Sequence, residues 1–295
     1  MARIAIIGPG AIGGVIAAQL HRLGRHEILL CARTALARLQ VETPDGPITM
    51  QPTVLTDPAG APPVDWVLIT TKAYDASGAA RWFDRLCAEG APVAILQNGV
   101  EHRERFAPFL PVDRLLPVIV DLPAERRDPA HIQQRGRGLL TVTDDAQGRE
   151  FAELFDGTPL EVTLTADFKS VAWRKLCLNS VGIINALLQQ PTGIFREDSI
   201  AELADKIAQE CLVVGRAEGA VLEESLPQDI VQRCRNAPPD AVNSLHGDRL
   251  AGRPMELAAR NGVIVRLGKK HGIPTPCNEM AVTLLTMATR TNGSG

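Results

Sequence analysis

The chain has 295 residues, which at about 100–200 residues per domain is enough for two domains, each with its own core. Its 31 Lys and Arg residues nearly balance 34 Asp and Glu residues, so a net charge of −3 leaves no basic excess for nucleic acid. No apolar stretch approaches the roughly 18–20 residues of a membrane-spanning helix, and the N-terminus lacks the long apolar segment of a secretory signal. We therefore expect a cytoplasmic protein with no nucleic-acid or membrane partner.

The pattern of cysteines and histidines argues against a metal site or a disulfide framework. The six cysteines form no CxxC pair, and the six histidines show no ligand or nucleophile spacing. We expect reduced thiols and no bound metal. The cysteines are Cys31, Cys87, Cys177, Cys211, Cys234 and Cys277.

The first half of the chain alternates between strand-like and helix-like segments. Short apolar runs predict strands at Arg3–Ile7, Glu27–Ala32, Trp66–Thr70, Val93–Leu96 and Leu115–Val120. Helical patterns lie between them at Ala11–Leu23 and Asp75–Ala88. Such alternation indicates a mostly parallel, doubly wound sheet of the Rossmann type. Weaker strand patterns at residues 47–54 and 131–143 fit antiparallel additions at a sheet edge.

The second half is predicted to be mostly helical. The expected helices are Phe168–Gln189, Asp198–Glu218, Pro227–Asn236, Ala241–Ala251, Met255–His271 and Cys277–Ala288, followed by a frayed tail at residues 289–295. We predict an α/β fold in which a Rossmann domain, residues 1–166, precedes a helical domain, residues 167–295.

A glycine motif follows the first predicted strand directly. The segment Gly8-Pro9-Gly10-Ala11-Ile12-Gly13 is GxGxxG between a strand and a helix. In such a motif the first glycine makes the tight turn, the second leaves room for a pyrophosphate, and the third allows close helix packing. The helix N-terminus then favours the anion. We expect residues 8–13 to bind a dinucleotide, the alternative being a glycine-rich turn without a ligand.

The tip of the second strand bears on the choice of nicotinamide cofactor. NAD sites carry an acid about 20 residues after the motif, whereas this strand ends at Ala32-Arg33-Thr34. The guanidinium of Arg33 suits a 2′-phosphate, which indicates NADP(H) over a merely solvated arginine. Lys72 and Asn98 follow the third and fourth strands and should face the same crevice. Taken alone, Lys72 could equally be a surface lysine, and Asn98-Gly99 a turn.

Polar residues at helical spacing mark the second half. Lys175 and Asn179 lie four residues apart on a predicted helix, and so do Ser244 and Asp248. Glu256 lies two residues after Pro254, in the expected first turn of the next helix. Considered singly, Lys175 is better explained as a lysine that snorkels to solvent, and Glu256 as an acid that compensates a helix dipole.

Taken together, these motifs resemble the ketopantoate reductase family (2-dehydropantoate 2-reductases) in order and spacing, from Arg3 to about Met287. The segments that carry the resemblance are GPGAIGG at 8–14, Arg33, Thr71-Lys72-Ala73, Gln97-Asn98-Gly99, Trp173–Asn179, Ser244 with Asp248 and Glu256, and Gly272–Pro276. The resemblance implies NADPH-dependent reduction of 2-dehydropantoate to pantoate, for pantothenate and coenzyme A synthesis. It also implies an active site between the two domains, and a homodimer, since many members dimerise through the second domain.

The resemblance assigns roles position by position. Lys175 matches the catalytic lysine that protonates the nascent alkoxide, and Glu256 matches an acid that contacts the substrate hydroxyl. The substrate-binding candidates are Asn98, Asn179 and Ser244, together with Asp248 on the same helical face as Ser244. Arg33 and Lys72 match residues that contact the adenosine phosphate, and Asn98 also borders the cofactor.

Two positions depart from the family pattern. Ile183 and Ala241 stand where members acting on ketopantoate often have asparagines. On a regular helix Asn185 would point roughly 200° away from Ile183 and could not replace it. Two alternatives therefore remain: a reductase of the same family acting on another 2-oxo acid or related carbonyl compound, and an NADP-binding sensor with little turnover.

Overall fold

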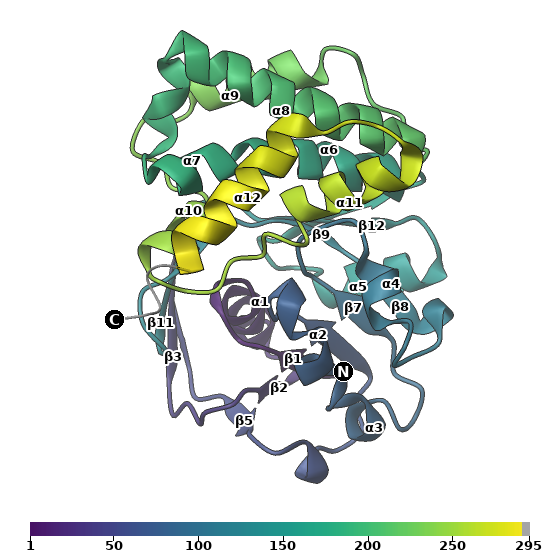
Figure 1. Ribbon diagram of the computed structural model, residues 1–295. Helices are drawn as coiled ribbons and strands as arrows, with labels where there is room; N and C mark the ends of the chain where they lie inside the picture. Colours follow the sequence, from purple (N-terminus) through teal and green to yellow (C-terminus); the bar gives the residue numbers. More distant parts are fainter. Residues whose placement is uncertain (291–295) are drawn as a thin grey trace. The chain divides into compact units, whose positions relative to one another are not determined.

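The computed structural model describes residues 1–290, which fall into two compact units (Figure 1). The first unit is Met1–Phe168 and contains all the strands of the described chain, whereas the second begins at Lys169 and is helical. The predicted α/β class, with a parallel sheet followed by a helical part, is confirmed. No helix within residues 1–290 combines the length and apolar character needed to cross a bilayer.

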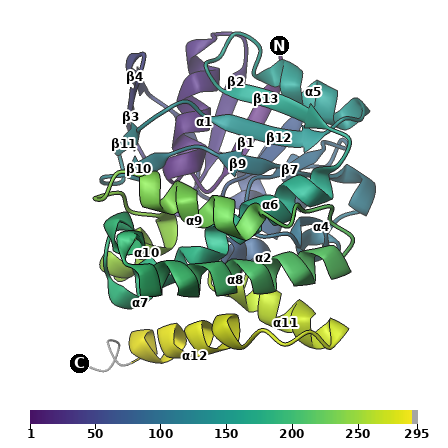
Figure 2. The same cartoon turned by 90° about the horizontal axis from the view of Figure 1, so that it is seen from above.

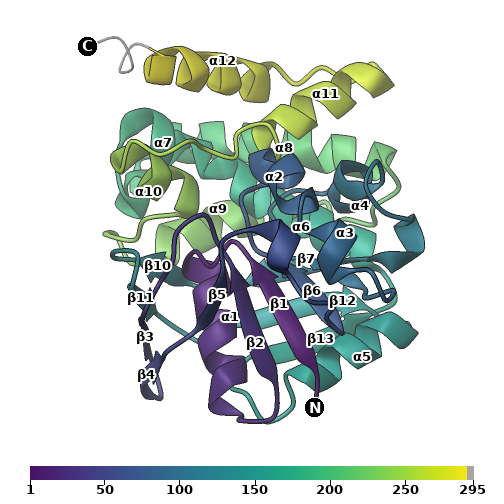
Figure 3. The ribbon, with the colours of Figure 1, turned by 90° about the horizontal axis from the view of Figure 1, so that it is seen from below.

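The central sheet of the first unit has six parallel strands in the order β5-β2-β1-β6-β7-β8 (Figure 3). The strands are β1 (Arg3–Ile7), β2 (Glu27–Cys31), β5 (Thr53–Leu55), β6 (Trp66–Ile69), β7 (Val93–Ile95) and β8 (Leu115–Pro117). The order reverses between β1 and β6, where Ile7 pairs with both Cys31 and Ile69. Ligands of doubly wound sheets bind at the carboxyl ends of the strands beside such a switch point.

Helices cover both faces of this sheet because its strands are apolar on both sides. Ile4 and Ile6 of β1 point into a core that includes α1 (Ala11–Arg22) and α5 (Ala146–Leu154). Ala5 and Ile7 point the other way, into a second core. That core also takes in residues of the short helices α2 (Ala76–Ala80), α3 (Phe83–Leu86) and α4 (His102–Phe106).

The weaker strand segments do not extend the edge of the central sheet as antiparallel strands, contrary to expectation. One small sheet, β10-β11-β3-β4, packs against α1, and another, β13-β12-β9, is visible in Figure 2. The part of residues 47–54 that does join the central sheet, β5, pairs with β2 in parallel. The strands of the small sheets are β3 (Leu39–Thr43), β4 (Gly46–Met50), β9 (Ile119–Asp121), β10 (Ala124–Arg126), β11 (His131–Gln134), β12 (Leu139–Thr143) and β13 (Glu161–Thr165).

Two other expected elements of the first unit are divided. The strand expected at 115–120 becomes β8 and β9: β8 pairs with β7 in the central sheet, whereas β9 pairs with β12 in a small sheet. The helix expected at 75–88 breaks into α2 and α3 after a 3₁₀ turn. The 3₁₀ turns of this unit are η1 (Pro58–Gly60), η2 (Ala73–Asp75) and η3 (Val112–Arg114).

The second unit is organised around the 20-residue helix α8, which packs against α9, α11 and α12. Its hydrophobic face includes Ala204, Ile207, Ala208 and Cys211, at the helical spacing expected of a buried stripe. The elements are α6 (Phe168–Val181), α7 (Ile183–Leu188), η4 (Thr192–Arg196), α8 (Asp198–Ala217), α9 (Leu226–Asn236), α10 (Ser244–Leu250), α11 (Asn261–His271) and α12 (Pro276–Arg290).

Several helix boundaries in this unit differ from the prediction. The helix expected at 168–189 is interrupted at Gly182, and the one expected from Met255 begins only at Asn261, so Glu256 is not in a first helical turn. Helix α10 starts at Ser244 because the side chain of Asn243 caps it, accepting a hydrogen bond from the amide of His246. Helix α12 continues to Arg290, so residues 289 and 290 are not frayed, while 291–295 lie outside the described residues.

Candidate functional site

The glycine motif makes a tight turn at the carboxyl end of β1. The amide of Gly8 donates to the carbonyl of Cys31, 3.0 Å away, and the amide of Gly10 donates back to the carbonyl of Gly8 at 2.6 Å. Gly8 has φ +84°, and a Cβ there would lie 2.5 Å from Cγ2 of Thr71. Only glycine fits both the conformation and the space.

The glycines at the start of α1 differ in what surrounds them. A Cβ on Gly13 would lie 2.2 Å from Oγ1 of Thr70, and one on Gly14 would lie 2.1 Å from Cδ1 of Ile132. A Cβ on Gly10 would meet nothing closer than 3.9 Å. Gly13 and Gly14 therefore allow α1 to approach the sheets on both sides, whereas the space at Gly10 is open.

The N-terminus of α1 is free of competing negative charge. Gly10 occupies the N-cap position without a side-chain cap, and the first turn, which includes Ala11 and Ile12, has no acidic residue. Pro9 lies within the turn and has no amide hydrogen. The helix N-terminus can thus offer backbone amides and the positive end of its dipole to an anion.

A buried glutamine joins the loops that follow β6 and β7. Nε2 of Gln97 donates to Oγ1 of Thr71 at 3.0 Å and to the carbonyl of Lys72 at 3.2 Å. Its Oε1 accepts from Nη1 of Arg105 at 2.8 Å. This places the backbone of Lys72 beside the segment that contains Asn98. Gln97 was not a predicted site residue, although its place at the end of a strand, next to Asn98, was a usable signal.

His102 contacts the main chain of the loop that follows β7. Its Nε2 lies 2.8 Å from the carbonyl of Gln97, which fits an N–H donor, and its ring meets that of Phe168 edge-on. Complete burial, assisted by the positive charges of Arg105 and Arg103, lowers the pKa of His102 to about 4. The imidazole is therefore neutral at physiological pH.

Arg33 lies in the segment after β2 and is exposed. It makes no hydrogen bond or ion pair with any residue of the described chain. Its guanidinium is thus exposed near the carboxyl end of β2, and its role in binding a phosphate stays a prediction.

In the second unit, Lys175 and Asn179 lie one turn apart on α6, and both are half-buried. Ser244 is exposed at the first position of α10, and Asp248, one turn later, is buried. Oδ1 of Asp248 accepts from Nε of Arg253 at 3.0 Å. Glu256 is buried in the segment between α10 and α11.

A residue absent from the prediction, Arg260, brings most of these positions together. Its side chain is fully buried, Nη1 lies 3.3 Å from Oγ of Ser244, and Nη2 donates to the main-chain carbonyl of Asn179. Burial lowers the pKa of Arg260 to about 10, while the carboxylates of Glu256 and Asp248 oppose that shift. An arginine beside a helix start gave no sequence signal, because most arginines are exposed.

The same contacts explain why α6 ends where it does. The carbonyl of Asn179 accepts from Arg260 and from the amide of Gly182, and the carbonyl of Ser180 accepts from Nδ2 of Asn261 at 2.9 Å. Two consecutive side chains thus satisfy carbonyls at the end of the helix.

Asn185 lies on α7, just after the interruption at Gly182, and contacts Asn243. Nδ2 of Asn243 donates both to Oδ1 of Asn185, at 2.9 Å, and to the carbonyl of Gly182, at 3.2 Å. Ile183 and Asn185 both lie on α7, so the interruption before this helix does not change the angle expected between their side chains. Ile183 is fully buried, and the carbonyl of Ala241 accepts hydrogen bonds from Thr192.

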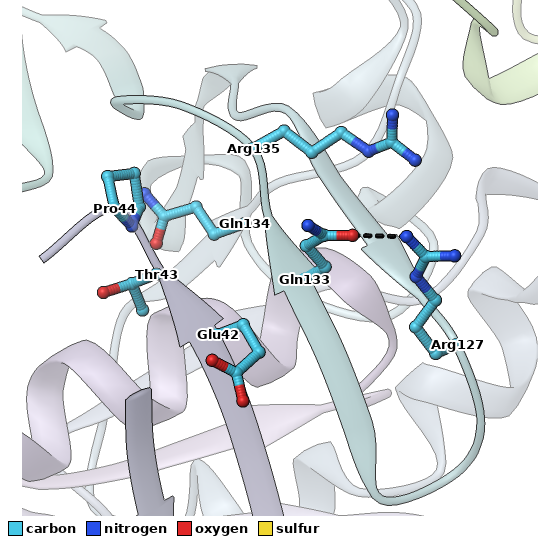
Figure 4. A pocket seen from close by; sticks show the side chains of 7 residues that line it. All are labelled: Glu42, Thr43, Pro44, Arg127, Gln133, Gln134 and Arg135. Carbon is cyan, nitrogen blue, oxygen red and sulfur yellow. Dashed lines mark hydrogen bonds between the residues drawn. The ribbon is translucent and has the colours of Figure 1, made fainter. Parts of the chain in front are cut away.

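A surface hollow lies on the small sheet that includes β3 and β11 (Figure 4). Arg127 and Arg135 border it together with Glu42, and Arg127 donates to Gln133. None of the predicted site residues lines it. Among residues 1–290, no group of three His, Cys, Asp or Glu side chains could hold a metal ion, and all six cysteines are free.

Comparison with known proteins identifies relatives along nearly the whole chain. Residues 4–147 match the family model "Ketopantoate reductase PanE/ApbA", and residues 167–289 match its C-terminal counterpart. A 2-dehydropantoate 2-reductase from Caulobacter vibrioides is 48% identical over 288 residues, covering 98% of this chain and 99% of that protein.

Solved structures show the same fold. The crystal structure of a 2-dehydropantoate 2-reductase from Geobacter metallireducens GS-15 superposes with a TM-score of 0.91 at 28% identity, covering 97% of this chain and 99% of that one. A dimeric ketopantoate reductase from Staphylococcus aureus has a TM-score of 0.87 at 24% identity, over 99% of this chain and 100% of that chain.

Proposed function

Because this chain belongs to the ketopantoate reductase family, we propose that it reduces 2-dehydropantoate to pantoate with NADPH, for pantothenate and coenzyme A synthesis. The observation that carries this proposal is the 48% identity, over almost the full length of both chains, to a 2-dehydropantoate 2-reductase. The six free cysteines fit a reducing compartment such as the cytoplasm.

The first unit has the features that a dinucleotide requires. The open space at Gly10 and the uncapped start of α1, within residues 8–13, suit a pyrophosphate. We assign Arg33 to the adenosine 2′-phosphate, and its exposed guanidinium, which has no hydrogen bond or ion pair within residues 1–290, supports NADP(H) over NAD(H). Lys72 and Asn98, on the loops joined by Gln97, complete the proposed cofactor site.

The second unit supplies the residue types that ketone reduction needs. Bound NADPH supplies a hydride to the 2-oxo carbon, which leaves negative charge on the oxygen. We assign Lys175 to stabilise that oxygen and give it a proton, and Glu256 to orient the substrate hydroxyl. Asn98, Asn179, Ser244 and Asp248 are the proposed substrate-binding groups, and hold the ketone in one orientation.

The test of this function is the initial rate of NADPH oxidation with 2-dehydropantoate beside a panel of other 2-oxo acids. We expect the highest kcat/KM for 2-dehydropantoate, despite the apolar Ile183 and Ala241. A higher kcat/KM for another 2-oxo acid would instead assign this chain to a different substrate. NADPH binding without turnover of any of them would point to a sensor.

A homodimer is the proposed assembly, and α12 is its proposed contact surface. Met280, Leu284 and Met287 follow one face of this helix, and each is about half exposed. Exposed apolar stripes of this kind mark interaction surfaces, and the related Staphylococcus aureus enzyme is described as dimeric. Light scattering should give a dimer for the wild type and a monomer for Leu284→Glu, and a monomeric wild type would contradict the proposal.

A further inference from the structure

Arg260 is a buried cation at the centre of the polar cluster in the second unit. We propose that it is a positioning residue for the substrate: its guanidinium fixes the hydroxyl of Ser244 and the end of α6 that carries Asn179. This inference rests on the proposed function, because Ser244 and Asn179 are its substrate-binding groups. Sequence patterns gave Arg260 no role, and its importance follows from the contacts alone.

The charge balance around Arg260 is the first argument. Glu256 and Asp248 are both buried, and two buried carboxylates without a cation would repel one another. The effect of both carboxylates on the pKa of Arg260 shows that its charge is felt by each of them. Arg253 also pairs with Asp248, but its side chain is 56% exposed. Arg260 is thus a buried positive charge that interacts with both carboxylates.

The second argument is the geometry of the guanidinium. Nη1 reaches Ser244 on α10, and Nη2 reaches the carbonyl of Asn179 on α6, so one planar group joins two helices. The fixed angle between its donors sets the distance between those helices, which the single ammonium of a lysine cannot do. A Cβ on Gly182 would lie 3.0 Å from Nη2, so the absence of a side chain there leaves room for the guanidinium.

The third argument concerns the helix that carries Lys175. Arg260 and the amide of Gly182 share the carbonyl of Asn179 where α6 ends, which fixes the last turn of that helix. The direction of the Asn179 side chain follows from that turn, and Lys175 lies one turn earlier on the same rigid element. A shift of Arg260 should therefore disturb substrate placement more than cofactor binding, because the proposed cofactor groups lie in the first unit.

The test compares Arg260→Lys with the wild type in steady-state kinetics with 2-dehydropantoate and NADPH. The variant keeps the positive charge but loses the planar guanidinium, whose two nitrogens contact Ser244 and the carbonyl of Asn179. We expect the KM for 2-dehydropantoate to rise about tenfold or more, while the KM for NADPH stays within about twofold. Gly182→Ala, whose added methyl group would lie 3.0 Å from Nη2 of Arg260 and also 3.0 Å from Nδ2 of Asn243, should raise the same KM by a smaller factor and serves if Arg260→Lys does not fold.

A double-mutant cycle separates positioning from general support of the fold. If Arg260 acts through Ser244, Arg260→Lys should have an effect at least about threefold smaller in the Ser244→Ala background than in the wild type. The matched control is Arg235→Met, which removes another arginine of this unit that donates to a main-chain carbonyl, that of Phe195. That variant should leave the KM for 2-dehydropantoate unchanged.

The outcomes distinguish this inference from the function on which it rests. An active wild type with an unchanged substrate KM in Arg260→Lys, or fully additive effects in the cycle, would overturn the positioning role alone. Equal increases in the KM for NADPH and for 2-dehydropantoate would show a general structural role and overturn it as well. A wild type that binds NADPH but reduces no 2-oxo acid would overturn the proposed function and this inference with it.

Discussion

The glycine turn of the first unit and the cluster of Arg260, Glu256, Asp248 and Ser244 in the second unit provide polar groups in different ways. Around Gly8 and Gly10 the polar groups are main-chain amides and carbonyls, and the lack of side chains on the glycines leaves room for the turn and for a ligand. Around Arg260 the polar groups are side chains on α10 and in the residues that precede α11, together with one main-chain carbonyl at the end of α6.

This difference sets how each region responds to mutation. A turn made of main-chain groups tolerates little added volume, whereas a charged cluster tolerates little change in charge or reach. Substitutions in the first region should therefore act through space and through cofactor binding. Substitutions in the second region should change substrate binding and the transfer of a proton to the substrate oxygen.

The largest expected effect lies in the second region, at the proposed general acid. Lys175→Ala should lower kcat by about 100- to 10,000-fold while NADPH still binds, because proton donation is lost but the first unit is untouched. Steady-state rates and fluorescence titration with NADPH measure the two properties. Lys169→Ala is the control, since Lys169 lies on the same helix but donates to the carbonyl of Glu218. A Lys175→Ala enzyme of normal kcat would remove the catalytic assignment.

The next largest effect concerns the pH dependence of stability and is expected at His102, which contacts the carbonyl of Gln97. Its pKa of about 4 in the folded protein is lower than the 6.5 of a free histidine, so the unfolded chain binds the proton first as pH falls. The stability that depends on a neutral His102 is complete above pH 6.5 and is lost as pH falls toward 4, by about 3 kcal/mol.

Denaturant unfolding between pH 7 and pH 4 measures this loss. His102→Gln, which keeps an N–H donor for the carbonyl of Gln97, should flatten the pH dependence in that interval. His21→Gln changes an exposed histidine and should leave the slope as in the wild type. Identical slopes in all three proteins would show that His102 is not held neutral by burial.

Alanine substitutions of Gly13 and Gly10 should distinguish an effect on packing from an effect on cofactor binding. Gly13→Ala places a methyl group against Thr70 and should destabilise the protein by about 1–3 kcal/mol. Gly10→Ala meets open space, so its unfolding midpoint should match the wild type while its affinity for NADPH falls roughly tenfold. Thermal unfolding and NADPH titration of both variants give the comparison, and unchanged affinity in Gly10→Ala would exclude a close approach of the pyrophosphate.

The smallest expected effect concerns cofactor choice. Arg33→Gln should raise the KM for NADPH up to roughly tenfold and leave that for NADH unchanged, because only NADPH carries the 2′-phosphate. Stability should not change, since Arg33 is exposed and has no hydrogen bond or ion pair to lose within the described residues. Arg38→Gln, which changes another exposed arginine of the same segment, is the control. Equal effects on both cofactors would argue against a phosphate contact.

Local patterns sufficed for much of the first unit. The run Arg3–Ile7, the glycines after it and the helix from Ala11 lie next to one another in the chain, and the structure keeps those boundaries. The predicted polar positions after β2, β6 and β7 do lie at strand ends. Prediction failed for the small sheets, because β11 pairs with β3 across some 90 residues of chain, and no local pattern encodes that pairing.

In the second unit the same reasoning found Lys175, Asn179, Ser244 and Asp248 on helices but misplaced Glu256 and missed Arg260. The hydrophobic period of a helix does not reveal a break caused by a distant side chain. Gly182 interrupts α6 and α7 where Arg260 takes the carbonyl of Asn179, 81 residues away in sequence. Asn185, on the helix after this break, accepts a hydrogen bond from the side chain of Asn243.

The sequence by itself determined the α/β class, the dinucleotide turn and the family of this protein, because each is expressed in neighbouring residues or in the order of short motifs. Only the tertiary structure decided how the second unit's polar residues meet, that Gln97 joins two loops, and that Arg260 is buried where the carboxylates of Glu256 and Asp248 act on it. The physical reason is that an arginine is stable in the interior only when partners from elsewhere in the chain compensate its charge, and those partners come together only on folding.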